Sequence, residues 1–180
     1  MRPVFLIGYM GSGKSTLGKA LATWLGIQFL DLDDYIEEKY ETTINEIFAK
    51  AGVRKFREIE QQALCEVAAT SDAVIACGGG TPCFEGNMQL MNNAGLTIWL
   101  TTTPQRITSR LCLPEQKAKR PLIKDKPDAE ILDTVTRGLE EREPFYSKAM
   151  LRFDSTRLES VEEINETARQ LAELLKNSSI

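Results

Sequence analysis

The stretch "GYMGSGKST", from Gly8 to Thr16, follows the apolar run "VFLI" and decides how the rest of the chain is read. Gly8, Gly13 and Lys14, followed by Ser15, fit the pattern G-x-x-x-x-G-K-[ST], which requires a strand before it and a helix after it. A chance match in a chain of this length is on the order of one in a hundred. The stretch therefore predicts a phosphate-binding loop.

Each residue type in this loop has a physical task. Gly11 and Gly13 allow backbone conformations that are closed to other residues, so consecutive N–H groups can point at an anion. The following helix adds its positive N-terminal end. Lys14 suits the β- and γ-phosphates, Ser15 suits Mg²⁺, and Thr16 is a weaker candidate for the α-phosphate. We predict an Mg²⁺–nucleoside triphosphate bound by Gly11, Ser12, Gly13, Lys14, Ser15 and Thr16. No N-K-x-D segment is present to read guanine, so ATP is expected.

Length and charge narrow the class of protein. The 180 residues fit one domain, residues 1–180, with its own core. A formal net charge of −4 gives no footprint for nucleic acid. No apolar run is long enough to span a membrane, and a cleavable leader would destroy the phosphate loop. We expect a cytoplasmic protein with no nucleic-acid or membrane partner, and a monomer because no exposed apolar stripe is evident.

The titratable residues restrict the chemistry. The chain contains no histidine, which excludes Ser-His and Cys-His nucleophiles and histidine-ligated zinc. Its four cysteines have no metal-ligand spacing and are expected to be reduced. Any proton acceptor must therefore be a carboxylate or a less usual group.

Apolar runs and helical patterns alternate along the chain. Five runs predict strands over residues 3–8, 29–32, 73–78, 96–101 and 150–154. Helical patterns cover residues 14–25, 34–40, 44–69, 85–93, 104–111, 128–145 and 160–176. Strands that are apolar on both faces and alternate with helices predict a three-layer α/β/α domain around a five-stranded parallel sheet. Ligands are then expected at the carboxyl ends of the strands.

Two segments interrupt this alternation. The helical stretch from Asp34 to about Ala69 is longer than a single crossover needs. Residues 112–128 are rich in Lys and Pro and poor in apolar side chains. They form either a solvated loop or a mobile flap over the phosphate site, because long loops in compact domains are usually functional.

Charged residues near the second strand and the following helix suggest an acceptor pocket. In "FLDLDDY", strand alternation puts Asp31 and Asp33 on one side, with Asp34 opposite or capping the next helix. In "FREIE", Arg57 and Glu60 are neighbours on a helix. Each of these residues has a structural alternative: Asp33 as a helix cap, and Arg57 merely paired with Glu60.

Two later stretches add to the same pocket. "CGGGTP" places three glycines after the third strand, where a ligand can approach bare backbone N–H groups. "REPFY" places Arg142 two residues before Pro144. The glycines could form an ordinary turn and Arg142 could belong to a solvated charge run. Together, two arginines and a glycine nest suit an organic acid with hydroxyl groups.

The stretches "GYMGSGKST", "FLDLDD", "FREIE", "GGGTP", "KRPLI" and "EEREPFY", in this order and spacing, resemble the shikimate kinase family over roughly residues 4–157. The resemblance implies a P-loop kinase fold with a small acceptor-binding helical insertion at about 33–61 and a mobile lid at about 112–124. One departure is that Val53 follows Gly52 where the family commonly has Glu. This chain therefore has no counterpart of that acidic side chain, while Phe56 and Arg57 match.

The resemblance implies transfer of the ATP γ-phosphoryl group to the 3-hydroxyl of shikimate, on the route to chorismate and the aromatic amino acids. Asp33 would contact the ring hydroxyls and accept the proton. Arg57 and Arg142 would hold the carboxylate. Backbone contacts would come from Gly78, Gly79 and Gly80.

On the nucleotide side, the resemblance implies that Asp31 supports Mg²⁺ through water, beside Ser15. Arg120 in the lid would reach the phosphates, whereas Arg110 and Arg157 would flank adenine. The catalytic set implied is Asp33, Lys14 and Arg120.

Phosphoryl transfer passes through a loose transition state, so alignment and charge neutralisation supply most of the catalysis. An ordinary carboxylate can then serve as proton acceptor without histidine. Pro121 pushes Arg120 toward an extended backbone, which can aim its side chain inward. Two other functions stay open: a gluconate-type kinase, and an ATP-binding switch without turnover.

Overall fold

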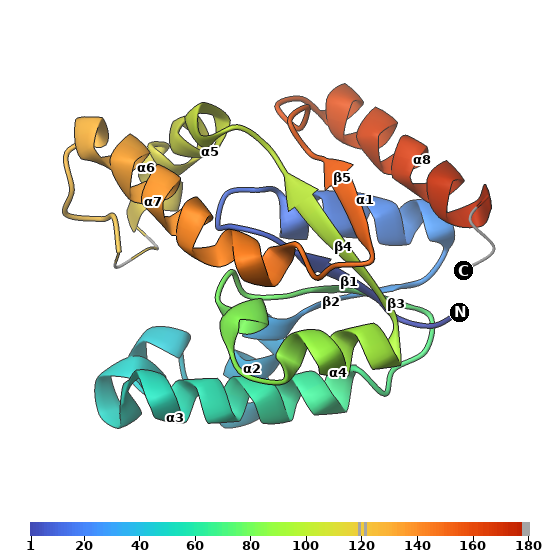
Figure 1. Ribbon diagram of the computed structural model, residues 1–180, viewed down its shortest axis with the longest axis horizontal. Helices are drawn as coiled ribbons and strands as arrows, with labels where there is room; N and C mark the ends of the chain where they lie inside the picture. Colours follow the sequence, from blue (N-terminus) through green and yellow to red (C-terminus); the bar gives the residue numbers. More distant parts are fainter. Residues whose placement is uncertain (119, 121, 178–180) are drawn as a thin grey trace.

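A five-stranded parallel sheet forms the middle of the protein (Figure 1). The computed structural model describes residues 1–118, 120 and 122–177. The strands run in the spatial order β2-β3-β1-β4-β5, and every neighbouring pair is parallel. Their bounds are β1 Val4–Ile7, β2 Gln28–Asp31, β3 Ala73–Ala76, β4 Leu96–Thr101 and β5 Leu151–Asp154. The predicted parallel sheet is confirmed.

Helices cover both faces of this sheet. Because successive strand side chains point to opposite faces, Phe5 and Ile7 of β1 join one hydrophobic cluster and Val4 and Leu6 join the other. Helices α1 (Lys14–Leu25) and α8 (Val161–Asn177) pack on the Val4 side. Helices α2 (Leu32–Tyr40), α3 (Ile44–Val67), α4 (Asn87–Ala94), α5 (Pro104–Leu111) and α7 (Asp128–Tyr146) pack on the other. Figure 1 shows the pair α1 and α8 on one side of the sheet and α3 with α4 on the other.

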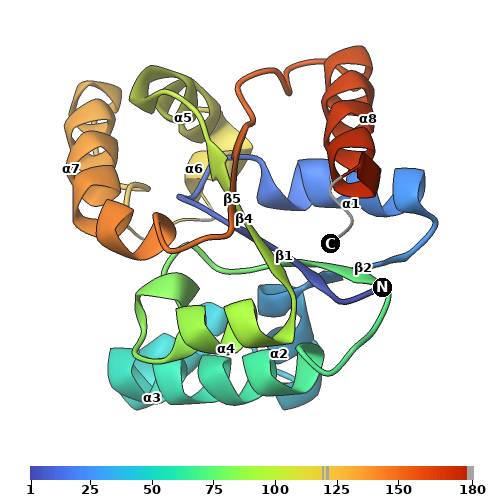
Figure 2. The ribbon, with the colours of Figure 1, turned by 45° about the vertical axis from the view of Figure 1, so that its right-hand side comes forward.

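All seven predicted helices are present, with ends within two residues of those expected. Two short elements were not predicted: the 3₁₀ helix η1 (Thr81–Cys83) and helix α6 (Pro114–Ala118). Figure 2 shows α5, α6 and α7 gathered at the same end of the sheet. Helices α5 and α6, from the second half of the chain, therefore lie across from the phosphate loop and the ends of β2 and β3.

The predicted acceptor-binding insertion contains a break. Helix α3 begins with a capping box, in which Thr43 and Glu46 bond each other's backbone N–H groups. Gly52 then has φ 78° and ψ 172°, so the single predicted helix is in fact two helical segments joined at this glycine. The rings of Phe48 and Phe56 pack across the break with centroids 4.3 Å apart. Val53, at the position of the family's usual Glu, is 63% exposed.

The predicted lid contains helix α6, which a Lys- and Pro-rich sequence did not indicate. The helix buries none of its residues, and the Lys117 ammonium pairs with Asp128 at 2.6 Å. The Arg120 carbonyl accepts the N–H groups of Ile123 and Lys124, so Arg120 begins a turn. Pro121, on which the prediction of an extended backbone at Arg120 rests, lies outside the described residues. Across the described part of the chain, no helix is long and apolar enough to cross a membrane.

Candidate active site

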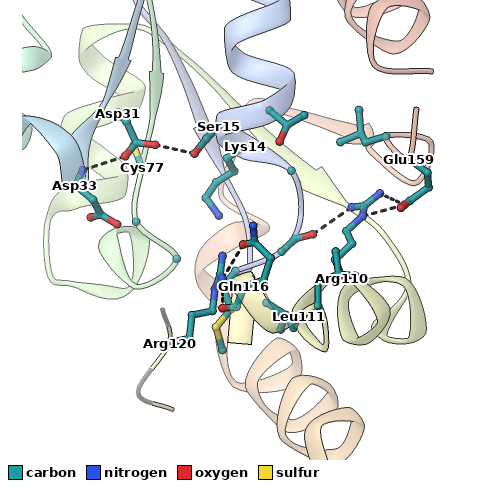
Figure 3. Close-up of a pocket in the computed structure, with 18 residues that line it drawn as sticks. Lys14, Ser15, Asp31, Asp33, Cys77, Arg110, Leu111, Gln116, Arg120 and Glu159 are labelled. Atoms are coloured by element: carbon teal, nitrogen blue, oxygen red, sulfur yellow. Dashed lines mark hydrogen bonds and ion pairs between the residues drawn. The ribbon is translucent and has the colours of Figure 1, made fainter. Parts of the chain in front are cut away.

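A cavity of about 490 Å³ opens at the carboxyl ends of β1, β2 and β3, between the phosphate loop and helices α5 and α6 (Figure 3). This is the edge of the sheet where the alternation of strands and helices predicted a ligand. The predicted residues that line it are Gly11, Gly13, Lys14, Ser15, Thr16, Asp31, Asp33, Gly78, Gly79, Arg110 and Arg120. Ser12 is 1% exposed and is not among the residues that line this cavity.

The phosphate loop has the backbone that its glycines predicted. Gly11 has φ 79° and Gly13 has φ 94°, both in the left-handed region that glycine adopts at low cost. The Gly11 carbonyl accepts from Arg110 at 3.1 Å, and the Ser12 carbonyl accepts from the Ser155 hydroxyl at 2.7 Å. These two bonds link the phosphate loop to α5 and to the residue that follows β5.

Lys14 curls over its own loop. Its ammonium donates to the carbonyls of Gly8 at 2.9 Å and Tyr9 at 3.0 Å. Burial lowers the pKa of Lys14 to about 8, against the opposing effect of the Asp33 and Asp31 carboxylates. A cation so poorly solvated would be stabilised by an added anion such as a phosphate.

Asp31 and Asp33 do not lie on one strand, and the alternation argument was wrong. Strand β2 ends at Asp31, which caps α2 by accepting the Asp33 N–H at 3.1 Å, so Asp33 lies in the first helical turn. Asp34 also lies in that turn and is not the cap. Both Asp31 and Asp33 still line the cavity, because a cap and the turn after it stand at the same edge of the sheet.

Asp31 also accepts a hydrogen bond from the Ser15 hydroxyl at 2.7 Å. A hydroxyl and a carboxylate at this spacing are oxygen donors of the kind that Mg²⁺ prefers. The described residues contain no group of three or more acidic, Cys or His side chains that could hold a metal. The donors thus fit Mg²⁺ that takes most of its ligands from phosphates and water.

Asp33 is the carboxyl group with the most perturbed environment. Burial raises its pKa to about 7, helped by the nearby Asp31 and Glu60 and opposed by Lys14 and Arg57. In Figure 3, Asp33 and Arg120 stand on different sides of the cavity, with Lys14 between them. A carboxyl that titrates near neutrality is suited to accept a proton from an alcohol.

Arg57 forms the ion pair with Glu60 that was one interpretation of the stretch "FREIE". Its guanidinium bonds Glu60 at 2.5 Å, and Glu60 is 1% exposed and also accepts from the Thr81 hydroxyl at 2.6 Å. The guanidinium packs against Gly80, where a Cβ would lie 2.7 Å from Arg57 Cζ. Only glycine leaves room for the side chain at this point.

Arg142 lies beside the same glycines. A Cβ on Gly79 would stand 3.2 Å from Arg142 Nη1, and the Tyr146 hydroxyl donates to the Gly79 carbonyl at 2.6 Å. The structure therefore brings Arg57 and Arg142 to adjacent residues of the glycine nest. Neither arginine is part of the wall of the main cavity.

The three arginines predicted for the nucleotide side differ in placement. Arg110 lines the cavity, and its guanidinium also bonds the Thr156 carbonyl and the Glu159 carboxylate, both at 2.9 Å. Arg120 lines it too and donates to both oxygens of Gln116. Arg157 does not line it: the side chain is 70% exposed and lies 3.5 Å from a Glu163 oxygen.

Several site residues were not found from the sequence. Glu159 and Gln116 bond the two arginines of the rim, and Tyr146 bonds the glycine nest. Glu159 is 49 residues from Arg110, and no local pattern indicates that pairing. Tyr146 stood within the quoted "REPFY", where an aromatic residue two positions after a proline carries no distinctive signal.

Comparison with known proteins gives a consistent result. The model of the shikimate kinase family matches residues 10–175. A shikimate kinase from Bacteroides fragilis is 45% identical over 96% of this chain and 95% of its own length.

Solved structures agree. The shikimate kinase from Bacteroides thetaiotaomicron has a TM-score of 0.93 and 43% identity, covering 97% of this chain and 98% of its own. A shikimate kinase from Acinetobacter baumannii, in complex with shikimate, has a TM-score of 0.85 and 28% identity over 100% and 96% of the two chains. A gluconokinase from Sinorhizobium meliloti, 18% identical with a TM-score of 0.57, shares the fold alone. The chain therefore belongs to the shikimate kinase family, a family of ATP-dependent kinases.

Proposed function

We propose that this protein transfers the γ-phosphoryl group of ATP to the 3-hydroxyl of shikimate, giving shikimate 3-phosphate and ADP for the synthesis of chorismate and the aromatic amino acids. The observation that carries the proposal is that Lys14 of the phosphate loop, the Asp33 carboxyl, Gly78 and Gly79 line one cavity. A nucleoside triphosphate and a small polyhydroxy acid can react when they are held side by side, and this cavity has groups suited to each of them.

ATP would occupy the phosphate loop, with Lys14 and the N-terminus of α1 against its phosphates. Ser15 would hold Mg²⁺, with Asp31 supporting it through water; when bound, the ion would neutralise phosphate charge. Arg110 would lie at the nucleotide's edge, and Arg157 would reach adenine only after its exposed side chain turns inward.

Shikimate would lie between Asp33 and the glycine nest. Arg57 and Arg142 would bind its carboxylate from behind Gly78, Gly79 and Gly80, because a guanidinium forms strong charge-assisted bonds with such a group. This would point the ring hydroxyls at Asp33, whose raised pKa suits it to accept a proton as the phosphoryl group is transferred.

Arg120 would complete the site. Its guanidinium is half-buried and bonds Gln116 of the same segment, within reach of the cavity that it lines. Transfer needs positive charge around the migrating phosphoryl group, and closure of residues 112–124 would bring that charge while excluding water.

The deciding experiment is ADP release measured with ATP–Mg²⁺ and shikimate, gluconate, AMP or no acceptor. We expect turnover with shikimate alone. Turnover with gluconate would assign a gluconate-type kinase, and none with any acceptor would favour an ATP-binding switch. Omission of Mg²⁺, with EDTA present, is expected to abolish ADP release and tests the metal requirement in the same assay.

We further propose that the protein acts as a monomer in the cytoplasm, where ATP and Mg²⁺ are supplied. The elements named above assemble the whole cavity from one chain. Light scattering at the concentration used for kinetics tests this: a stable dimer would contradict it.

A further inference from the structure

Tyr9, the second residue of the phosphate loop, connects that loop to Arg142. Its carbonyl accepts the Lys14 ammonium at 3.0 Å and the Ser12 N–H at 3.1 Å. Its side chain is 1% exposed, and its ring centroid lies 5.0 Å from Arg142 Cζ. One residue therefore contacts the phosphate-binding lysine with its backbone and a guanidinium of the acceptor side with its ring.

The hydroxyl end of the Tyr9 ring lies against Gly138 in α7. A Cβ at Gly138 would lie 2.8 Å from Tyr9 Cε2, 2.9 Å from Cζ and closer still to the hydroxyl oxygen. Real Cβ atoms essentially never make such contacts. Because glycine is unfavourable inside a helix, its presence here indicates that the space is needed by the ring.

Arg142 differs from Arg57 in how its charge is surrounded. Across the described residues, no carboxylate forms an ion pair with Arg142, whereas Arg57 is bonded to the buried Glu60. The neighbours that hold the Arg142 guanidinium are the Tyr9 ring face and the Tyr146 hydroxyl. These neighbours orient the guanidinium without neutralising it, so its charge remains available to an anionic ligand.

We infer that Tyr9 is a positioning residue for the carboxylate of the acceptor. Its ring occupies the space that Gly138 leaves open and fixes the position of the Arg142 guanidinium relative to the phosphate loop. The inference rests on the proposed function. It makes one side chain responsible for the relative placement of the acid group and the phosphate loop.

The first test compares Tyr9→Leu with Tyr9→Phe. Tyr9→Leu removes the ring face, and the KM for shikimate should rise about 5- to 30-fold, the loss expected for a partly buried cation–π contact. The KM for ATP should change less than about twofold, because the backbone contacts to Lys14 remain. Tyr9→Phe keeps the ring and should restore the KM for shikimate.

The substrate itself provides a matched control. Shikimate methyl ester has no charged group for Arg142, so its KM should be the same for the wild type and for Tyr9→Leu. An equal rise for acid and ester, or equal rises for shikimate and ATP, would reduce Tyr9 to a packing residue of the loop.

Gly138→Ala displaces the same ring without substituting any residue of the phosphate loop, and it keeps the test open if Tyr9→Leu is unstable. Alone, it should raise the KM for shikimate by displacing the ring; combined with Tyr9→Leu, it should add little. Additive effects would contradict the inference. If the wild type releases no ADP with shikimate, the proposed function fails, whereas normal wild-type turnover with unaltered KM values in every variant overturns only the role of Tyr9.

Discussion

Asp31 and Asp33 are two residues apart but have different hydrogen-bonding states. One oxygen of Asp31 accepts the Asp33 N–H and the other accepts the Ser15 hydroxyl. Among the described residues, none donates a hydrogen bond to the Asp33 carboxylate, which lies in the same cavity with its pKa raised to about 7. A carboxylate with both oxygens engaged is a poor base, so Asp33 is the residue we expect to take the proton.

Asp33→Asn should lower kcat by about 10²- to 10⁴-fold, the usual contribution of a positioned acid–base group. ATP binding, measured by calorimetry, should be retained because Asp33 is not in the phosphate loop. Asp34→Asn is the matched control, since Asp34 is exposed in the same turn. If Asp34→Asn is the inactive variant, the assignment is off by one residue.

The pH dependence of the free enzyme should follow the pair Asp33 and Lys14. Below pH about 7, Asp33 is protonated and cannot accept; above about 8, Lys14 loses the charge that attracts phosphate. The profile of kcat/KM should therefore be bell-shaped, with apparent pKa values that belong to the interacting pair. A profile flat from pH 5.5 to 7.5 would contradict this role for Asp33.

Helices α3 and α7 each supply one arginine, and the two should respond differently to removal. Arg57→Ala leaves the buried Glu60 without its partner, which costs about 3–5 kcal/mol of stability. Arg142→Ala breaks no such pair and loses its contact with the Tyr9 ring instead, so its Tm should fall less than that of Arg57→Ala. Both variants should raise the KM for shikimate. Each should lose about 2–3 kcal/mol of binding free energy, the contribution of one charge-assisted hydrogen bond.

Kinetics and thermal melts on the two variants measure this difference. The methyl ester of shikimate should be as poor a substrate for the wild type as the acid is for Arg142→Ala. Equal rates for acid and ester would remove the carboxylate clamp from the mechanism.

Arg120, two residues after the end of α6, lies in the wall of the cavity, and Arg120→Ala should reduce kcat about 10³-fold with a small effect on ATP binding. Lys117→Ala is the control, because its pair with the exposed Asp128 is a surface ion pair worth about 0–1 kcal/mol. Hydrogen exchange across residues 112–124 should slow when an ATP analogue and shikimate are both bound. Unchanged exchange together with a normal kcat for Arg120→Ala would make this segment a surface loop.

The ionised form of Asp33 lowers the stability of the whole protein, because its carboxylate is buried in the active site. Because the folded-state pKa of Asp33 is above its unfolded value, its contribution to stability is full in acid and is lost as pH rises toward 7. Asp33→Asn should therefore raise the unfolding free energy more at pH 8 than at pH 5, by about 1–3 kcal/mol. Urea melts at the two pH values test this, and a gain larger at pH 5 would reverse the sign and refute it.

The fold was predictable because its signals are local. Apolar runs, the Gly13-Lys14 pattern at a strand–helix junction and helical periodicity each lie within a few residues of the chain, and the order of elements implies a parallel sheet. The two features of the fold that were not predicted have weaker signals in the local sequence. Helix α6 buries nothing and so has no apolar periodicity, and Gly52 breaks α3 inside an otherwise regular helical pattern.

The residue types of the candidate site were also legible in the sequence, since phosphate, carboxylate and hydroxyl groups each require particular partners. Their environments were not. Glu60 neutralises Arg57, whereas the Tyr9 ring lies against Arg142. Arg110 bonds Glu159, 49 residues away. The contacts of Arg142 and Arg110 join elements far apart in the chain. Burial and long-range approach set which charges are paired and where each pKa lies, and only the packed chain creates them.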